Sequence, residues 1–298
     1  MSDNRDVLER ALQRIVWELR PYLADIVIIG GWVPYLYRRY GSTSSWNNAL
    51  SLTAEVDVLV TPNLPRDGRM SLADLLEEAG FRPTNSNDSA AVWVNDPERG
   101  EKIEFFVPHS GTIRNLNQVI PIGSQDRIGA IALSSLDVMQ RHTILLAVPA
   151  VSSTDEHATA NIRVPLLGAY LLNKAATFNR RSPLTDGGPN PKRAKDLLYL
   201  RDVMAANAET VQQIENDVGK ILRGDPVVQH LADTAANNVD CVARFDKAVL
   251  RETAEMLAER DTMSVDAGVA DIQGHLLDLS EILVRFRSPD LVEEREDQ

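Results

Sequence analysis

Two carboxylates occupy alternate positions in a short apolar segment, Thr53-Ala54-Glu55-Val56-Asp57-Val58-Leu59-Val60. The segment predicts a β-strand, and because side chains alternate between the faces of a strand, Glu55 and Asp57 share one face. Neighbouring carboxylates repel each other and are costly to bury. A hard cation such as Mg²⁺ prefers carboxylate oxygens and keeps water and phosphate ligands. The pair therefore indicates either a metal site beside a nucleoside triphosphate or an edge strand with a solvated acidic face.

A third carboxylate interrupts another apolar segment, Lys102-Ile103-Glu104-Phe105-Phe106-Val107. If this strand lies beside the first, Glu104 completes a group of three carboxylates. Such a group would bind two metal ions or supply a base for an incoming hydroxyl. Glu101 is a competitor for this role, but it lies at the end of the preceding turn. The alternative is a hairpin in which Lys102 and Glu104 face water.

Two glycines, Gly30 and Gly31, lie between a predicted strand at residues 25–29 and a predicted helix at residues 32–40. Glycines at such a turn leave the backbone N–H groups at the start of a helix open to a phosphate. The pattern is neither the G-x-G-x-x-G of a dinucleotide site nor a Walker motif, and glycine is common in strand-to-helix turns. The turn therefore indicates a phosphate site only in combination with the carboxylates.

Basic residues gather in one short stretch of the second half of an otherwise acidic chain: Lys174, Arg180, Arg181, Lys192, Arg193 and Lys195. Lys174 falls on a predicted helix, from which its ammonium would contact triphosphate oxygens as a point charge. Asp196, at the start of the next predicted helix, would orient Lys174 or another basic side chain. The alternative is an exposed helix pair with ordinary ion pairs.

The spacing of apolar residues predicts the elements that position these side chains. A helix over residues 7–19 precedes the first strand, and Ser71 is predicted to cap a helix that ends at Ala79. Residues 91–94 and 102–107 read as a hairpin, and residues 143–148 and 162–164 as two more strands. Beyond Pro165 the pattern is helical, with a break at residues 182–191. We therefore expect an α/β (α+β) fold: a small mixed-sheet domain at residues 1–164 followed by a helical domain at residues 165–298.

Composition narrows the classes of protein. The chain has 298 residues, of which 44% are hydrophobic, so it can form a sizeable core. Its single cysteine, Cys241, excludes an intrachain disulfide and a cysteine zinc site. We expect a cytoplasmic protein without a membrane span, because no signal peptide or long apolar run is evident. The formal net charge of −12 opposes nonspecific binding to nucleic acid and suits a cationic partner.

These residues together carry a resemblance. The first half of the chain resembles the nucleotidyltransferase superfamily related to polymerase β, through Gly30-Gly31-Trp32, then Thr53-x-Glu55-x-Asp57, then Glu104. The second half looks like the AbiEii-type nucleotidyltransferases, a group that includes toxins of type IV toxin–antitoxin systems. The residues that carry this likeness are Lys174-Ala175-Ala176, Arg180-Arg181 and Lys195-Asp196-Leu197-Leu198. The likeness covers residues 25–205. Gly31 stands where the superfamily usually has serine, and Glu55 where aspartate is commoner; Gly-Gly-Trp also occurs in aminoglycoside and lincosamide nucleotidyltransferases.

The resemblance implies a Mg²⁺- (or Mn²⁺-) dependent nucleotidyltransferase that moves an NMP from an NTP to an acceptor. Glu55, Asp57 and Glu104 would bind metal, and Lys174 and Asp196 would join them in catalysis. The residues expected to bind the nucleotide are Gly30, Gly31, Thr53, Lys174, Arg180 and Lys195.

The acceptor and partners stay open at this point. An RNA end or a protein as acceptor, with an antitoxin protein as partner, follows from the AbiEii likeness. A cationic antibiotic as acceptor follows from Gly-Gly-Trp and the acidity of the chain. A third interpretation is a noncatalytic nucleotide-binding or interaction module on the same fold, favoured by Glu55 and the missing serine.

Overall fold

The computed structural model describes residues 2–41, 46, 50, 53–84, 89–95, 101–109, 117–150, 158–180, 184–185, 188–225 and 228–286. The chain forms two compact units. The first contains Met1–Ser42 and Leu52–Pro165, and the second contains Thr43–Ser51 and Leu166–Gln298.

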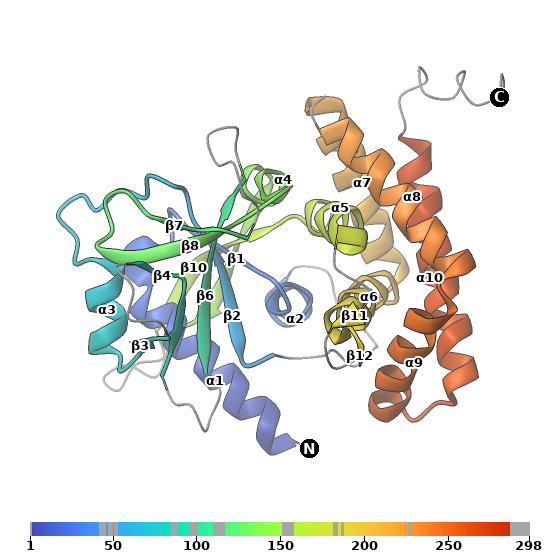
Figure 1. The fold of residues 1–298 in the computed structure, drawn as a ribbon, viewed down its shortest axis with the longest axis horizontal. Coiled ribbons are helices and arrows are strands. Elements are labelled where there is room, and N and C mark those ends of the chain that lie inside the picture. The colour runs from blue at the N-terminus through green and yellow to red at the C-terminus, as the bar shows by residue number, and fades with distance from the viewer. Residues whose placement is uncertain are drawn as a thin grey trace. The chain divides into compact units, whose positions relative to one another are not determined.

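The first unit is built on a mixed sheet, with β1, β2 and β6 side by side (Figure 1). One path through the sheet runs β1-β2-β6-β5-β3, and β8 also pairs with β6, β4 and β7. The β2–β6, β6–β8 and β4–β8 pairs are parallel, and the others in this sheet are antiparallel. The strands are β1 (Val27–Ile29), β2 (Glu55–Leu59), β3 (Arg82–Pro83), β4 (Ser89–Ala90), β5 (Val92–Val94), β6 (Lys102–Pro108), β7 (Val119–Pro121) and β8 (Arg127–Leu133).

Helices and a separate hairpin complete the first unit. The helices are α1 (Ser2–Glu18), α2 (Trp32–Tyr40), α3 (Leu72–Glu78) and α4 (Leu136–Arg141), and the hairpin is β9 (Thr143–Pro149) with β10 (Thr159–Pro165). The predicted cap of α3 is confirmed, because the Ser71 hydroxyl accepts a hydrogen bond from the Asp74 N–H. Tyr37 on α2 donates to the Pro165 carbonyl at the end of β10, over 2.9 Å. That bond connects the helix after the glycine turn to the hairpin.

Burial alternates along the two strands that carry the carboxylates. On β2, Val56 and Val58 are buried, whereas the residues on either side of Val56 are half-buried. On β6, Ile103 and Phe105 are buried and Glu104 between them is half-buried. One face of the β2–β6 pair therefore packs into the core, and the other carries polar groups.

The second unit is helical: α5 (Leu167–Thr177), α6 (Pro191–Met204), α7 (Ala208–Gly224), α8 (Gln229–Phe245), α9 (Lys247–Asp261) and α10 (Val265–Arg285). A short strand pair, β11 (Leu184–Thr185) and β12 (Gly188–Pro189), falls in the predicted break before α6. Helix α8 packs against α5 and α10, and α9 and α10 both pack against α6. The predicted fold class, a mixed sheet with helices followed by a helical region, is confirmed.

Buried charges connect three helices of the second unit. Asp202 on α6 is almost fully buried and accepts two hydrogen bonds from Arg260 on α9, over 2.6 and 2.8 Å. Arg201, the neighbouring residue on α6, donates to Asp271 on α10 over 2.6 Å. Buried ions of opposite sign have to stay paired, because removal of one partner leaves the other without compensation. The contacts therefore hold α9 and α10 in fixed positions against α6.

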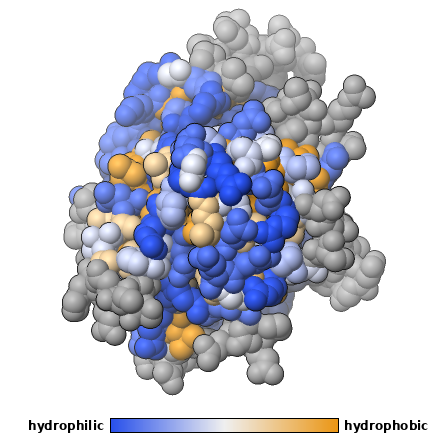
Figure 2. All heavy atoms as spheres, turned by 90° about the vertical axis from the view of Figure 1, so that its left-hand side faces the viewer, coloured by the Kyte–Doolittle hydropathy of each residue, from blue (hydrophilic) through white to orange (hydrophobic). Residues whose placement is uncertain are grey.

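The surface on the α3 side of the first unit is predominantly hydrophilic, and its apolar side chains form small separate patches (Figure 2). Part of this surface is ionic: Arg127 donates to both Asp74 and Glu77, residues of α3. Exposed pairs of this kind contribute little to stability. This face therefore shows no feature beyond an ordinary solvated surface among the residues coloured there.

Helices α1 and α2 meet at Glu9, whose carboxylate accepts hydrogen bonds from the hydroxyls of Tyr35 (2.6 Å) and Tyr40 (2.5 Å). Burial alone would raise the pKa of Glu9, but these two hydrogen bonds and the charge of Arg39 outweigh it, so the pKa lies below its usual value. A carboxyl group whose pKa is lowered by folding stabilises the fold above its unfolded-state pKa. That contribution disappears as the pH falls through the folded-state pKa.

We predict that Tyr40→Phe lowers the free energy of unfolding by about 1–2 kcal/mol at pH 7, the cost of a hydrogen bond to a charged group. The cost should shrink as the pH falls through the lowered pKa of Glu9, because the carboxylate then becomes protonated. Urea unfolding between pH 7 and about 3 measures it. Tyr37→Phe is the matched control, because it removes a hydrogen bond to the carbonyl of Pro165. A cost of Tyr40→Phe that does not change with pH would contradict the assignment.

Candidate active site

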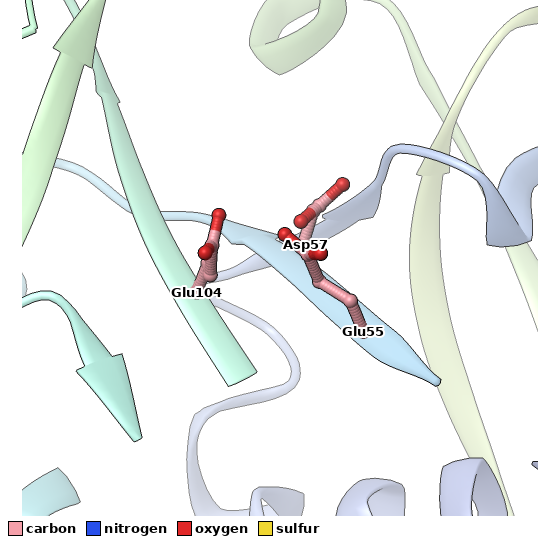
Figure 3. A group of neighbouring side chains, drawn as sticks. All are labelled: Glu55, Asp57 and Glu104. Atoms are coloured by element: carbon pink, nitrogen blue, oxygen red, sulfur yellow. The ribbon is translucent and has the colours of Figure 1, made fainter. Parts of the chain in front are cut away.

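The parallel pairing of β2 and β6 brings three carboxylates together (Figure 3). Asp57 lies opposite Glu104 in the register, and Glu55 is two residues away on the same face of β2. Each of the three offers an oxygen, and these oxygens lie within 4.8 Å of one another. We call Glu55, Asp57 and Glu104 the acidic triad. Although the strand that carries Glu104 is distant in sequence, the structure places it where the sequence-based hypothesis requires.

The acidic triad is partly shielded from water. The side chain of Glu55 is 34% exposed and that of Glu104 is 16% exposed. Burial raises the pKa of Glu104, and the neighbouring Glu55 carboxylate adds to this, against the opposing effect of Lys102. The pKa is raised because the ionised form of Glu104 is poorly solvated in this partly buried site and is repelled by the Glu55 carboxylate.

A divalent cation fits this set of donors. The acidic triad supplies carboxylate oxygens alone, the ligands that Mg²⁺ and Mn²⁺ prefer. Oxygens on opposite sides of a Mg²⁺ ion lie about 4 Å apart, since each Mg–O distance is about 2.1 Å. Adjacent oxygens lie about 3 Å apart, so side chains whose oxygens are within 4.8 Å of one another would have to draw closer to share one ion.

Lys102 lies directly beside the acidic triad. In the register it is opposite Glu55, and its ammonium is 2.5 Å from Glu104 Oε1 and 3.4 Å from Glu55 Oε2. From the sequence, Lys102 enters only as part of a solvent-facing alternative, and this bridge is not predicted. The signal was present in the sequence, because Lys102 and Glu104 alternate on one strand. It becomes readable only when the partner strand and its register are known.

Gly30 packs against the carboxylate of Asp57. Its φ is +74°, in the region that only glycine adopts readily, and a Cβ atom there would lie 1.8 Å from Asp57 Oδ2. Gly31 follows as the N-cap residue of α2, where no side chain caps the helix. The glycine turn thus leaves room for the Asp57 carboxylate, and Gly30 and Gly31 are themselves buried. Thr53, before β2, accepts a hydrogen bond from the Glu55 N–H through its hydroxyl, over 3.3 Å.

Glu101 has a different role from its neighbour Glu104. It is buried, and its carboxylate accepts hydrogen bonds from Arg14 on α1 and from the Asn95 amide. It is not part of the acidic triad. The contacts connect α1 to Asn95 and Glu101, which lie next to β5 and β6, so Glu101 is a structural residue.

In the second unit, Lys174 and Asp196 form an ion pair between α5 and α6. Lys174 Nζ is 2.8 Å from Asp196 Oδ1, and the two side chains are 15% and 6% exposed. The ammonium also lies 5.5 Å from the ring centre of Tyr199, over which Lys195 is placed at 5.8 Å. The predicted orientation of Lys174 by Asp196 therefore corresponds to a direct contact.

Of the remaining basic residues, Arg193 has partners of its own within the second unit. Arg193 pairs with Asp246 over 2.9 Å and stacks on Phe178, which makes it a packing residue within the second unit. The side chain of Arg180 and the whole of Arg181 lie outside the described residues. The predicted nucleotide contact of Arg180 thus stays a prediction.

The chain belongs to the nucleotidyltransferase family: residues 10–220 match the family model described as "Nucleotidyltransferase". The match includes the glycine turn, the acidic triad and the Lys174–Asp196 pair, and leaves α8, α9 and α10 outside. A search of curated proteins finds no match to this chain. No helix in the described part of the chain combines the length and apolar composition needed to cross a membrane.

We predict that Gly30→Ala is destabilising for two reasons. The positive φ costs about 1 kcal/mol for any residue with a Cβ, and the collision with Asp57 adds about 1–3 kcal/mol of overpacking. Gly68→Ala is the matched control, since Gly68 has nearly the same φ, +76°, and a Cβ atom there would meet nothing within 4 Å. Denaturant unfolding of both variants separates the two costs. Equal losses of stability would show that Gly30 and Asp57 do not constrain each other.

Proposed function

We propose that this protein is a divalent-metal-dependent nucleotidyltransferase that transfers an NMP from an NTP to an acceptor and releases pyrophosphate. The observation that carries the proposal is the acidic triad: three carboxylates from two paired strands, with oxygens within 4.8 Å of one another. Membership of the nucleotidyltransferase family supplies the reaction class.

The reaction forms one bond and breaks one. An acceptor oxygen attacks the α-phosphorus of the NTP, and the bond from that phosphorus to the oxygen that bridges the α- and β-phosphates breaks, so pyrophosphate leaves. A Mg²⁺ or Mn²⁺ ion held by Glu55, Asp57 and Glu104 would neutralise charge on the triphosphate. In the alternative role for Glu104, its carboxylate would take up the acceptor proton instead of binding metal.

The other proposed residues act on the triphosphate. Gly30 and Gly31 would let phosphate oxygens approach the N–H groups at the start of α2. Lys174, held by Asp196, would contribute a fixed positive charge to the transition state, with Lys195 and Arg180 as further phosphate contacts. Thr53, whose hydroxyl accepts a hydrogen bond from the Glu55 N–H, would also contact the nucleotide.

We predict that Asp57→Asn lowers NMP transfer by at least about 100-fold, as the loss of one preorganised electrostatic group in a transfer site typically does. Transfer of label from α-³²P-NTP in the presence of Mg²⁺ measures it, and a thermal shift with NTP and Mg²⁺ reports binding independently of the acceptor. Glu101→Gln is the control, because it alters a nearby carboxylate that lies outside the acidic triad. Wild-type activity in Asp57→Asn would refute the proposed site.

For the acceptor, we propose an RNA end or a protein, with the chain acting as the toxin of a toxin–antitoxin pair. The resemblance of the α5–α6 segment to AbiEii-type enzymes supports this choice. An aminoglycoside- or lincosamide-like antibiotic is the second candidate, because the net charge of −12 favours a cationic acceptor. A noncatalytic nucleotide-binding module is the third.

Incubation with labelled NTPs and separate pools of tRNA, protein and aminoglycosides distinguishes these candidates. Label on tRNA or protein supports the toxin proposal, and label on a small molecule alone refutes it. NTP binding without transfer to any pool would favour the noncatalytic module.

A further inference from the structure

Lys102 is the only lysine among the first 165 residues of the chain, whose other cationic side chains in that part are arginines and histidines. Its ammonium lies between two members of the acidic triad, 2.5 Å from Glu104 Oε1 and 3.4 Å from Glu55 Oε2. An ammonium is a compact charge on a flexible stem, unlike the planar fork of arginine, and it moves with little rearrangement. The lysine therefore occupies a position where two carboxylates attract a small cation.

Without a metal ion, the acidic triad needs positive charge from the protein itself. Three carboxylates with oxygens within 4.8 Å repel one another, and their partial burial weakens the compensation from water. Lys102 provides one positive charge from inside the same sheet, since it is opposite Glu55 and two residues before Glu104. A divalent ion that binds these carboxylates meets an ammonium already placed against two of them.

We propose that Lys102 is a positioning residue that acts as a built-in counter-cation. Before a metal arrives it offsets the repulsion between Glu55 and Glu104, and it lowers the metal affinity by competing for the same two carboxylates. On metal binding the ammonium leaves them and turns toward solvent, to which Lys102 is already 31% exposed. The inference rests on the proposed function, because it takes the acidic triad as the metal site.

An ordinary structural role makes the opposite prediction. If Lys102 only shaped the site, its removal would loosen the carboxylates and weaken metal binding. If it contacted phosphate and nothing else, its removal would weaken NTP binding and leave the affinity for the metal alone unchanged. If Lys102 instead competes with the metal for the carboxylates, its removal strengthens metal binding.

The test is a titration of the full chain with Mn²⁺ in the absence of nucleotide, with free Mn²⁺ measured by electron paramagnetic resonance. Lys102→Met keeps an unbranched side chain of similar length and removes the charge. We expect about a 3- to 10-fold tighter Mn²⁺ affinity from the loss of one close like charge. Lys102→Arg keeps the charge and should not tighten Mn²⁺ binding. Arg66→Met removes a cation from an exposed pair elsewhere in the unit and controls for net charge.

Unchanged or weaker Mn²⁺ binding by Lys102→Met overturns the inference. Asp57→Asn separates this failure from failure of the proposed function: if wild type binds Mn²⁺ and Asp57→Asn does not, the metal site stands whatever Lys102 does. If wild type binds no Mn²⁺, the proposed function fails and the inference fails with it.

A second measurement needs no substitution. Amine acylation of the wild-type chain, read residue by residue by mass spectrometry, should modify Lys102 more rapidly in saturating Mg²⁺ than in its absence, because the displaced ammonium is more accessible. Lys220, which is exposed on α7, is the internal reference. Equal labelling of Lys102 with and without Mg²⁺ would contradict displacement.

Discussion

The parallel pairing of β2 with β6 is the contact on which the rest of the site depends. Its register sets Asp57 opposite Glu104 and Glu55 opposite Lys102, so one sheet face carries three acids and one base. The opposite face, with Val56 and Ile103, is buried in the core. A slip of one residue would turn the carboxylates into the core and the valines outward. The hydrophobic core therefore fixes the chemistry of the polar face.

Local sequence patterns predict the parts of this arrangement that neighbouring residues determine. Alternation along one strand suffices to place Glu55 and Asp57 on a common face. Ser71 predicts the start of α3, because its hydroxyl caps the helix by accepting a hydrogen bond from the N–H of Asp74, three residues later. The helical second unit follows from apolar spacing alone. Glu104 could be proposed as a third member because it interrupts an apolar strand, but the sequence does not state which strand lies beside it.

What the sequence does not reveal is set by pairing between distant segments. Strand β8 joins the sheet through β6, β4 and β7, and no pattern within Arg127–Leu133 indicates those partners. The bridge from Lys102 to Glu55 depends on the register of two strands that are almost fifty residues apart. The contact of Gly30 with Asp57 depends on the path of a turn rather than on residue type, so the glycines read only as a site for phosphate.

The family match ends at residue 220, within α7, but the packing continues past that point. Helix α8 covers α5, and α9 and α10 cover α6, the two helices that present Lys174 and Asp196. Asp202 on α6 depends on Arg260 for its charge balance. The end of the family match is thus not the end of the folded unit. A chain cut at residue 220 would keep the matched sequence but lose the helices that pack against α5 and α6 and so support Lys174. Relatives with unrelated C-terminal segments would have to bury the same faces of α5 and α6 by other means.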